Sequence, residues 1–184
     1  MEIKITTQQI LKVLQILSWI IFLGLCVEAG GIIFNTISTI FINPEGVHNF
    51  WEGADLSFIY NFDKSHFIVI TIIMSIVAVL KAIMFYLIIK LFNQEKFSLT
   101  KPFSVELRQF ILNVSYLTLG IGLFSYSGIN YINWLAEQGV IGLNSETLHI
   151  AGADVWLFMS VTLFVIAQIV KRGIEIQTEN ELTI

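Results

Sequence analysis

The chain has 184 residues, of which 55% are hydrophobic and only 13% are charged, and its formal net charge is −4. Its mean hydropathy of +0.78 is too high for a soluble domain of this length, since soluble domains are only about 45–50% apolar. Cys26 is the only cysteine, which excludes an internal disulfide and a thiolate-rich zinc site. No basic stripe is present, so we expect no direct nucleic-acid binding.

Four long apolar stretches dominate the sequence, and they cover residues 14–41, 67–91, 105–131 and 153–170. Each can supply the roughly 17–25 apolar residues that an α-helix needs to cross about 30 Å of hydrocarbon. We therefore predict an all-α fold in which residues 1–184 form one integral membrane bundle of four transmembrane helices. The remaining segments are two outer loops, one inner loop and a polar tail: 42–66, 132–152, 92–104 and 173–184.

Positive charges gather at alternate ends of these stretches. Those before the first stretch, between the second and third, and after the fourth are Lys4, Lys12, Lys90, Lys96, Lys101, Arg108, Lys171 and Arg172. The two other connections hold only Lys64. The positive-inside rule thus predicts that both termini are cytoplasmic in the cell (inner) membrane. Bulky Leu25 before Cys26 argues against a cleaved lipoprotein signal, so we expect the first span to be retained.

The connections carry few local signals. Residues 56–62 alternate partly between apolar and polar, which is compatible with a short strand or with an aromatic segment at the headgroup level. Ser104 is a predicted N-cap of the third helix, with Glu106 in its first turn. One face of that helix is small and polar, which predicts close helix packing: Ser115, Thr118, Gly122 and Ser125. The tail 173–184 is expected to fray.

Glu28 is the sharpest candidate for a functional residue because it interrupts an uncharged stretch of the first helix. A carboxylate at that depth costs several kcal/mol unless it is neutralised, paired or hydrated. Gly24, Glu28, Gly31 and Asn35 share one helical face, which predicts a helix–helix contact. Glu28 is then either a proton- or cation-responsive group or a structural carboxyl, and the sequence favours the structural interpretation.

Lys81 is the other charge inside a span, and helix rise places it about 10 Å nearer the cytoplasm than Glu28. We therefore expect Lys81 to extend toward the cytoplasm rather than to pair with Glu28. His48, His66 and His149 fall in or beside the outer loops, where we expect them to be solvated and able to sense pH. No metal, cofactor or catalytic motif is present, so the sequence predicts no enzyme and no cofactor.

Two segments at the predicted cytoplasmic boundaries resemble a known family. One contains Lys101, Pro102 and Phe103, and the other runs through Lys171, Arg172 and Gly173. Both are similar to the bacterial four-span membrane proteins classed as domain of unknown function 2975. That family has no established activity or catalytic residue, but its members are commonly encoded beside a small helix-turn-helix regulator of the Cro/C1 type.

The resemblance implies that these six residues would dock such a regulator in the cytoplasm. The functional prediction is thus a membrane sensor or sequestering partner of a helix-turn-helix transcriptional regulator, surrounded by the lipid bilayer. The alternative is a small transporter or channel subunit that uses Glu28, with Asn35 and Lys81 as further candidates inside the membrane. The sequence is also compatible with a homo-oligomer.

Overall fold

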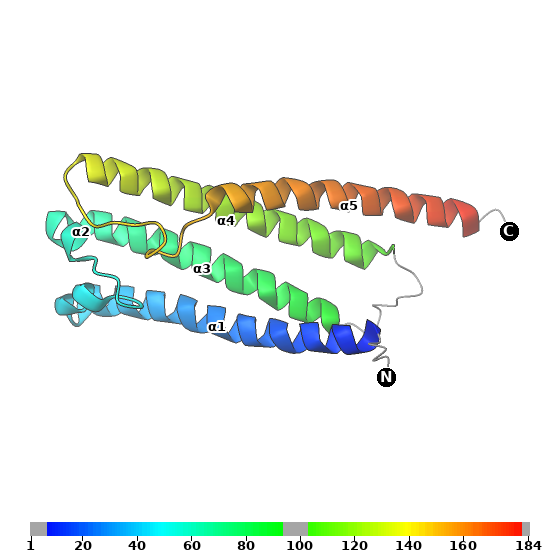
Figure 1. The fold of residues 1–184 in the computed structure, drawn as a ribbon, viewed down its shortest axis with the longest axis horizontal. Coiled ribbons are helices and arrows are strands. Elements are labelled where there is room, and N and C mark those ends of the chain that lie inside the picture. Colours follow the sequence, from blue (N-terminus) through cyan, green and yellow to red (C-terminus); the bar gives the residue numbers. More distant parts are fainter. Residues whose placement is uncertain (1–6, 94–102, 182–184) are drawn as a thin grey trace, which may run out of the picture.

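In a computed structural model, residues 7–93 and 103–181 are described, and every regular element among them is helical. The four long helices are α1 (Thr7–Phe41), α3 (Lys64–Phe92), α4 (Val105–Glu137) and α5 (Ala153–Glu181), as Figure 1 shows. Each is long and apolar enough to cross a membrane. The prediction of an all-α chain with four membrane-spanning helices is confirmed, and the protein is a multi-pass membrane protein.

All four helices extend beyond the predicted spans. A helix of 33 residues such as α4 is about 50 Å long, well above the roughly 30 Å of the hydrocarbon. The expectation of a fraying tail is wrong for residues 173–181, because α5 continues unbroken to Glu181. Glu175 accepts a hydrogen bond from Arg172 at 2.9 Å and lies 3.8 Å from Lys171, which supports the helix on this side.

The first loop, residues 42–63, contains two short helices and, within the part the structure describes, no strand. These helices are η1 (Pro44–Asn49) and α2 (Ser57–Phe62). The strand alternative is therefore wrong. Polar side chains satisfy the local backbone instead, since Asn43 accepts from the Glu45 N–H at 3.2 Å and Asp63 from the Ser65 N–H at 2.7 Å.

The long helices form an open row in the order α1, α3, α4, α5, so that α1 and α5 each pack along one neighbour only. The predicted packing face of α4 is confirmed, because Ser115 Oγ donates to the Ser160 carbonyl of α5 at 2.9 Å. A Cβ at Gly122 would lie 2.8 Å from the Leu157 side chain. Ser104 is the N-cap of α4, as predicted, and accepts from the Leu107 N–H at 3.1 Å.

One end of this row, which we call the loop end, carries the turn from α1 to α3 and the end of α4. At the opposite, terminal end, α1 begins and α5 ends (Figure 1). Leu157, in the first turns of α5, lies against Gly122, which is about 22 Å from the loop end of α4 by helix rise. Residues 138–152, the second loop, therefore turn back along the bundle before α5 starts.

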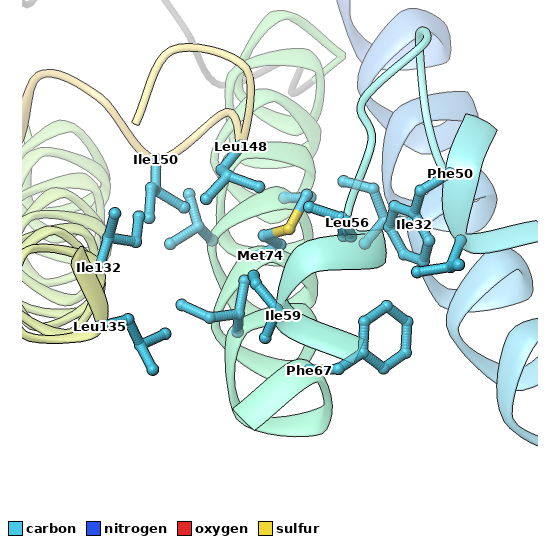
Figure 2. Packing of buried hydrophobic residues seen from close by; sticks show 14 of the residues in the cluster. Ile32, Phe50, Leu56, Ile59, Phe67, Met74, Ile132, Leu135, Leu148 and Ile150 are labelled. Atoms are coloured by element: carbon cyan, nitrogen blue, oxygen red, sulfur yellow. The ribbon is translucent and has the colours of Figure 1, made fainter. Parts of the chain in front are cut away.

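The buried core lies at the loop end, where both loops pack between the helices. Figure 2 shows side chains of the second loop meeting those of α3 and α4, and side chains of the first loop meeting α1. The completely or almost completely buried members include Ile32, Phe50, Leu56, Ile59, Phe67, Met74, Leu135, Leu148 and Ile150. By contrast, only 6% of the most apolar 18-residue stretch of α1 is buried, as expected of a helix that faces lipid.

Candidate functional site

Glu28 of α1 lies against a histidine from the second loop. Its Oε1 is 3.0 Å from His149 Nδ1, and the two side chains are only 17% and 26% exposed. No hydrogen bond of good geometry reaches this carboxylate oxygen, and the contact is an ion pair only when the imidazole is protonated. The expectation of a solvated His149 is wrong, because the second loop turns back along the helices and carries this residue to the level of Glu28.

The other side of the His149 ring faces the first loop. Glu52 Oε2 is 3.4 Å from His149 Nε2, and the Glu52 side chain is 65% exposed. Glu52 and His149 have φ angles of 49° and 57°, and they are the only non-glycine residues with positive φ in the described ranges 7–93 and 103–181. Such backbone conformations cost about 1–3 kcal/mol each and cluster at ligand clamps and switch regions. The two strained loop residues thus meet at one imidazole.

Lys81 of α3 reaches the same histidine. Its Nζ donates a hydrogen bond to the His149 carbonyl at 3.0 Å. The expectation that Lys81 extends toward the cytoplasm is therefore wrong, because the second loop supplies an acceptor within the bundle. Glu28 and Lys81 thus both contact His149, and among the ion pairs of the described residues there is none between Glu28 and Lys81 themselves. We refer to Glu28, Glu52, Lys81 and His149 as the polar cluster.

Two other residues of the Glu28 face, Gly31 and Asn35, pack against the first loop rather than against another long helix, contrary to the sequence prediction. Asn35 Nδ2 donates to the Phe50 carbonyl. The Trp51 ring covers Gly31, where a Cβ would lie 1.9 Å from the ring, whereas nothing lies within 4 Å of a Cβ at Gly24. The first loop therefore packs on α1 at Gly31 and Asn35, one to two turns from Glu28 toward the loop end.

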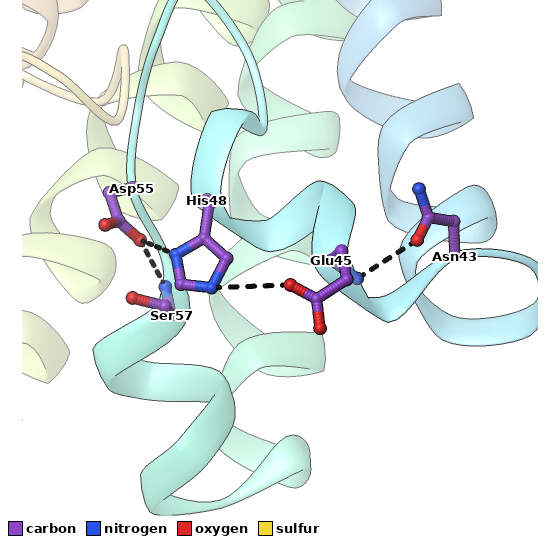
Figure 3. A network of polar contacts seen from close by, with 5 residues as sticks. All are labelled: Asn43, Glu45, His48, Asp55 and Ser57. Atoms are coloured by element: carbon purple, nitrogen blue, oxygen red, sulfur yellow. Dashed lines mark hydrogen bonds and ion pairs between the residues drawn. The ribbon is translucent and has the colours of Figure 1, made fainter.

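The other two histidines differ in their surroundings. His66 is half-buried, contrary to expectation: its Nδ1 is 2.6 Å from the Tyr131 hydroxyl, which links α3 to α4. His48 is 56% exposed, as expected, and lies 3.7 Å from Asp55 and 3.8 Å from Glu45 (Figure 3). Hydrogen bonds from the side chain and the N–H of Ser57 are the main reason that the pKa of Asp55 is lowered.

The polar cluster is not arranged as a metal site. Its two carboxylates lie on opposite ring nitrogens of His149, so the three groups do not converge on one point. In the described part of the chain, no three His, Cys, Asp or Glu residues are grouped to hold an ion. The cluster can instead bind or release a proton and hold two loops together.

Sequence reasoning missed Glu52, Trp51 and the role of His149. The available signal lay in the second loop, whose glycines Gly139, Gly142 and Gly152 all have positive φ. Such positions allow sharp changes of direction, and they indicate that this loop does not simply cross the surface. They do not reveal which helix the loop approaches.

A second site lies at the terminal end. A groove of about 670 Å³, which we call the terminal groove, is lined by Phe103, Ile169, Arg172, Gly173, Ile176, Gln177 and Asn180. Gly173 makes it possible, because a Cβ there would lie 2.7 Å from the Phe103 ring. Three of the six predicted docking residues thus meet, while Lys171 is exposed beside Glu175. The other two, Lys101 and Pro102, lie outside the described residues.

The helix α5 connects the two sites. It begins four residues after His149 and continues as a single helix of 29 residues, about 43 Å long, to Glu181. Its last turns form most of the terminal groove. A displacement of the second loop therefore has a continuous rigid element through which it can reach the groove.

No protein-family model, curated protein or solved structure matches the chain. The chain is therefore classed as a multi-pass helical membrane protein from the length and apolar character of its four long helices. The two sites and the helix between them are the basis for a functional proposal.

Proposed function

We propose that this protein is a receptor in the cell (inner) membrane, which detects a signal at the loop end and passes it to a cytoplasmic partner at the terminal end. The orientation follows from the positive-inside rule, since lysine and arginine accumulate where α1 begins, between α3 and α4, and late in α5. Both termini are then cytoplasmic, and the polar cluster faces the opposite side.

The observation that carries this proposal is that a polar cluster within the bundle is joined to the start of α5. Charged groups at membrane depth are costly and are usually retained for function. Here they hold a strained loop whose next element is the helix that forms the terminal groove. A signal that favours one position of the loop over another would alter the groove, as allosteric coupling requires.

The proposed partner is a small helix-turn-helix regulator, which the protein would sequester or release at the membrane. This part of the proposal rests on the resemblance to the four-span family. The convergence of Phe103, Arg172 and Gly173 at one groove supports it, because these residues come from the two segments that carry the resemblance.

The transporter alternative is less well supported. It requires polar groups that continue from Glu28 toward the terminal end. The cleft between α1 and α3 on that side is apolar instead, and it is lined by Phe22, Cys26, Ala29, Val79, Ala82, Ile83 and Tyr86. Among the described residues, the polar cluster is therefore not continued by a polar transport pathway toward the terminal end.

Co-purification of the full-length protein with any small helix-turn-helix protein encoded beside it tests the proposal. Ile176 lines the terminal groove, whereas Thr178 is exposed on the same helix and does not. We expect Ile176→Asp to reduce recovery of the regulator at least tenfold, and the matched control Thr178→Asp to leave it unchanged. Equal recovery with both variants, or no association of the unaltered protein under any condition, would refute the proposal.

A further inference from the structure

We propose that His149 is the proton-binding residue of this receptor: as an imidazolium it clamps both loops onto α1, and as a neutral ring it releases them. The inference rests on the proposed function and deepens it, because it names the signal as a proton and the residue that receives it.

A carboxylate lies near each nitrogen of the His149 ring. His149 presents Nδ1 to Glu28 at 3.0 Å and Nε2 to Glu52 at 3.4 Å. A neutral imidazole has one N–H and one lone pair, so in either tautomer one carboxylate faces a lone pair. An imidazolium has two N–H groups, and only this form can attract both carboxylates at once.

A protonated His149 also balances the charge of the polar cluster. The charged groups shown against His149 come from three elements: Glu28 from α1, Glu52 from the first loop and Lys81 from α3. In their ordinary ionisation states they carry two negative charges and one positive charge. The imidazolium makes the cluster neutral, whereas a neutral ring leaves one uncompensated negative charge. An unbalanced charge is costly in a partly buried site, so the protonated ring favours the closed arrangement.

The contact between Glu52 and His149 also joins two strained backbone positions. Glu52 and His149 both have backbone conformations that their side chains disfavour, with φ angles of 49° and 57°. The contact between them helps to hold both conformations. Loss of the proton removes that contact, and each loop can then relax to a more favourable backbone. Because α5 begins four residues later, relaxation of the second loop reaches the helix directly.

The direction of the pH dependence follows. The clamp needs the proton on His149, so it is present in acid and is lost when the pH rises far enough to remove that proton. The closed loops are therefore the acid form and the released loops the alkaline form.

Spin labels on the two elements test this directly. In a Cys26→Ser background, Ile37→Cys on α1 and Thr147→Cys on the second loop provide two exposed labelling sites. Double electron–electron resonance on the full chain in lipid nanodiscs should give one narrow distance peak at about pH 5, and most of that peak should be lost at about pH 8. A distribution that is the same at both pH values would overturn the proposal.

Three variants locate the effect. His149→Gln should abolish the change with pH, and His48→Gln, a matched histidine in the exposed first-loop network, should preserve it. Glu52 is mostly exposed, so Glu52→Gln should leave the fold intact and move the transition to lower pH. A wild-type pH response in His149→Gln, with an unchanged helical circular dichroism signal, would also overturn it. Should His149→Gln fail to fold, an unshifted transition in Glu52→Gln would do so instead.

The outcomes separate this inference from the proposed function. Regulator binding that depends on Ile176, without any loop movement, would leave a receptor whose signal is not a proton. Loop movement that depends on His149, without any regulator binding, would leave a proton-dependent clamp whose output is not the regulator.

Discussion

Replacing Gly31 by alanine should destabilise the protein, although alanine is the better helix former. The Trp51 ring occupies the space that the new methyl group needs, since the Cβ would lie 1.9 Å from the ring. The neighbouring Gly30 provides a matched control, because nothing lies within 4 Å of a Cβ at that position. Both glycines lie in α1, so the difference between the two variants isolates the contact with the first loop.

The magnitude follows from the geometry. Carbon atoms pack at about 3.5–4.0 Å, so the ring must retreat by about 2 Å. Overpacking of this kind costs about 1–3 kcal/mol. Each Gly→Ala change also gains up to about 1 kcal/mol of helix propensity. Gly30→Ala should therefore be neutral or stabilising, and Gly31→Ala should be less stable than Gly30→Ala by about 1–3 kcal/mol.

Unfolding in mixed detergent micelles of increasing sodium dodecyl sulfate content, followed by circular dichroism, measures both variants. We expect the midpoint of Gly31→Ala to fall at a lower sodium dodecyl sulfate fraction than that of Gly30→Ala. Hydrogen exchange of the first loop should rise in Gly31→Ala only. Equal midpoints and equal exchange would mean that Trp51 does not pack on α1, and the seating of the first loop above Glu28 would then be wrong.

Three further predictions concern single interactions. Lys81→Met removes the hydrogen bond to the His149 carbonyl, and should speed hydrogen exchange in residues 145–152, whereas Lys90→Met, on the exposed side of the same helix, should not. Ser115→Ala removes the bond to the Ser160 carbonyl and should lower the stability of the α4–α5 pair by about 0.5–1.5 kcal/mol in micelle unfolding, while Ser127→Ala, which removes only a bond within α4, should have a smaller effect. The pKa values of Asp55 and Asp63 are lowered mainly because Ser57 and Ser65 donate hydrogen bonds to them. The two ionised carboxylates therefore stabilise the first loop above about pH 4, and this stabilisation is lost as the pH falls through their lowered pKa values. Hydrogen exchange of the first loop, measured as the pH is lowered, should detect that loss of stability. Asp63→Asn keeps a capping side chain that does not titrate, so the increase in exchange at acid pH should be smaller in this variant. The same increase in Asp63→Asn as in the unaltered protein would argue against the cap.

The sequence determined the membrane helices because that property is local. A run of apolar residues long enough to cross the bilayer satisfies its backbone hydrogen bonds within its own helix and needs no distant partner. The same applies to Ser104, whose N-cap role depends only on the following residues. The helices nevertheless extend beyond the predicted spans, and a pair such as Arg172–Glu175 supports the added turns of α5.

Only the tertiary structure decided the polar cluster, because its members are far apart in sequence and no motif joins them. Glu28 was identified from its depth, but its partner depended on where the second loop runs. That path follows from the start of α5 opposite Gly122, halfway along α4, and from glycines that allow the loop to turn. Lys81 was misplaced for the same reason: whether a lysine in a membrane helix extends to one side or the other depends on the nearest acceptor, and the His149 carbonyl becomes that acceptor only once the chain has folded.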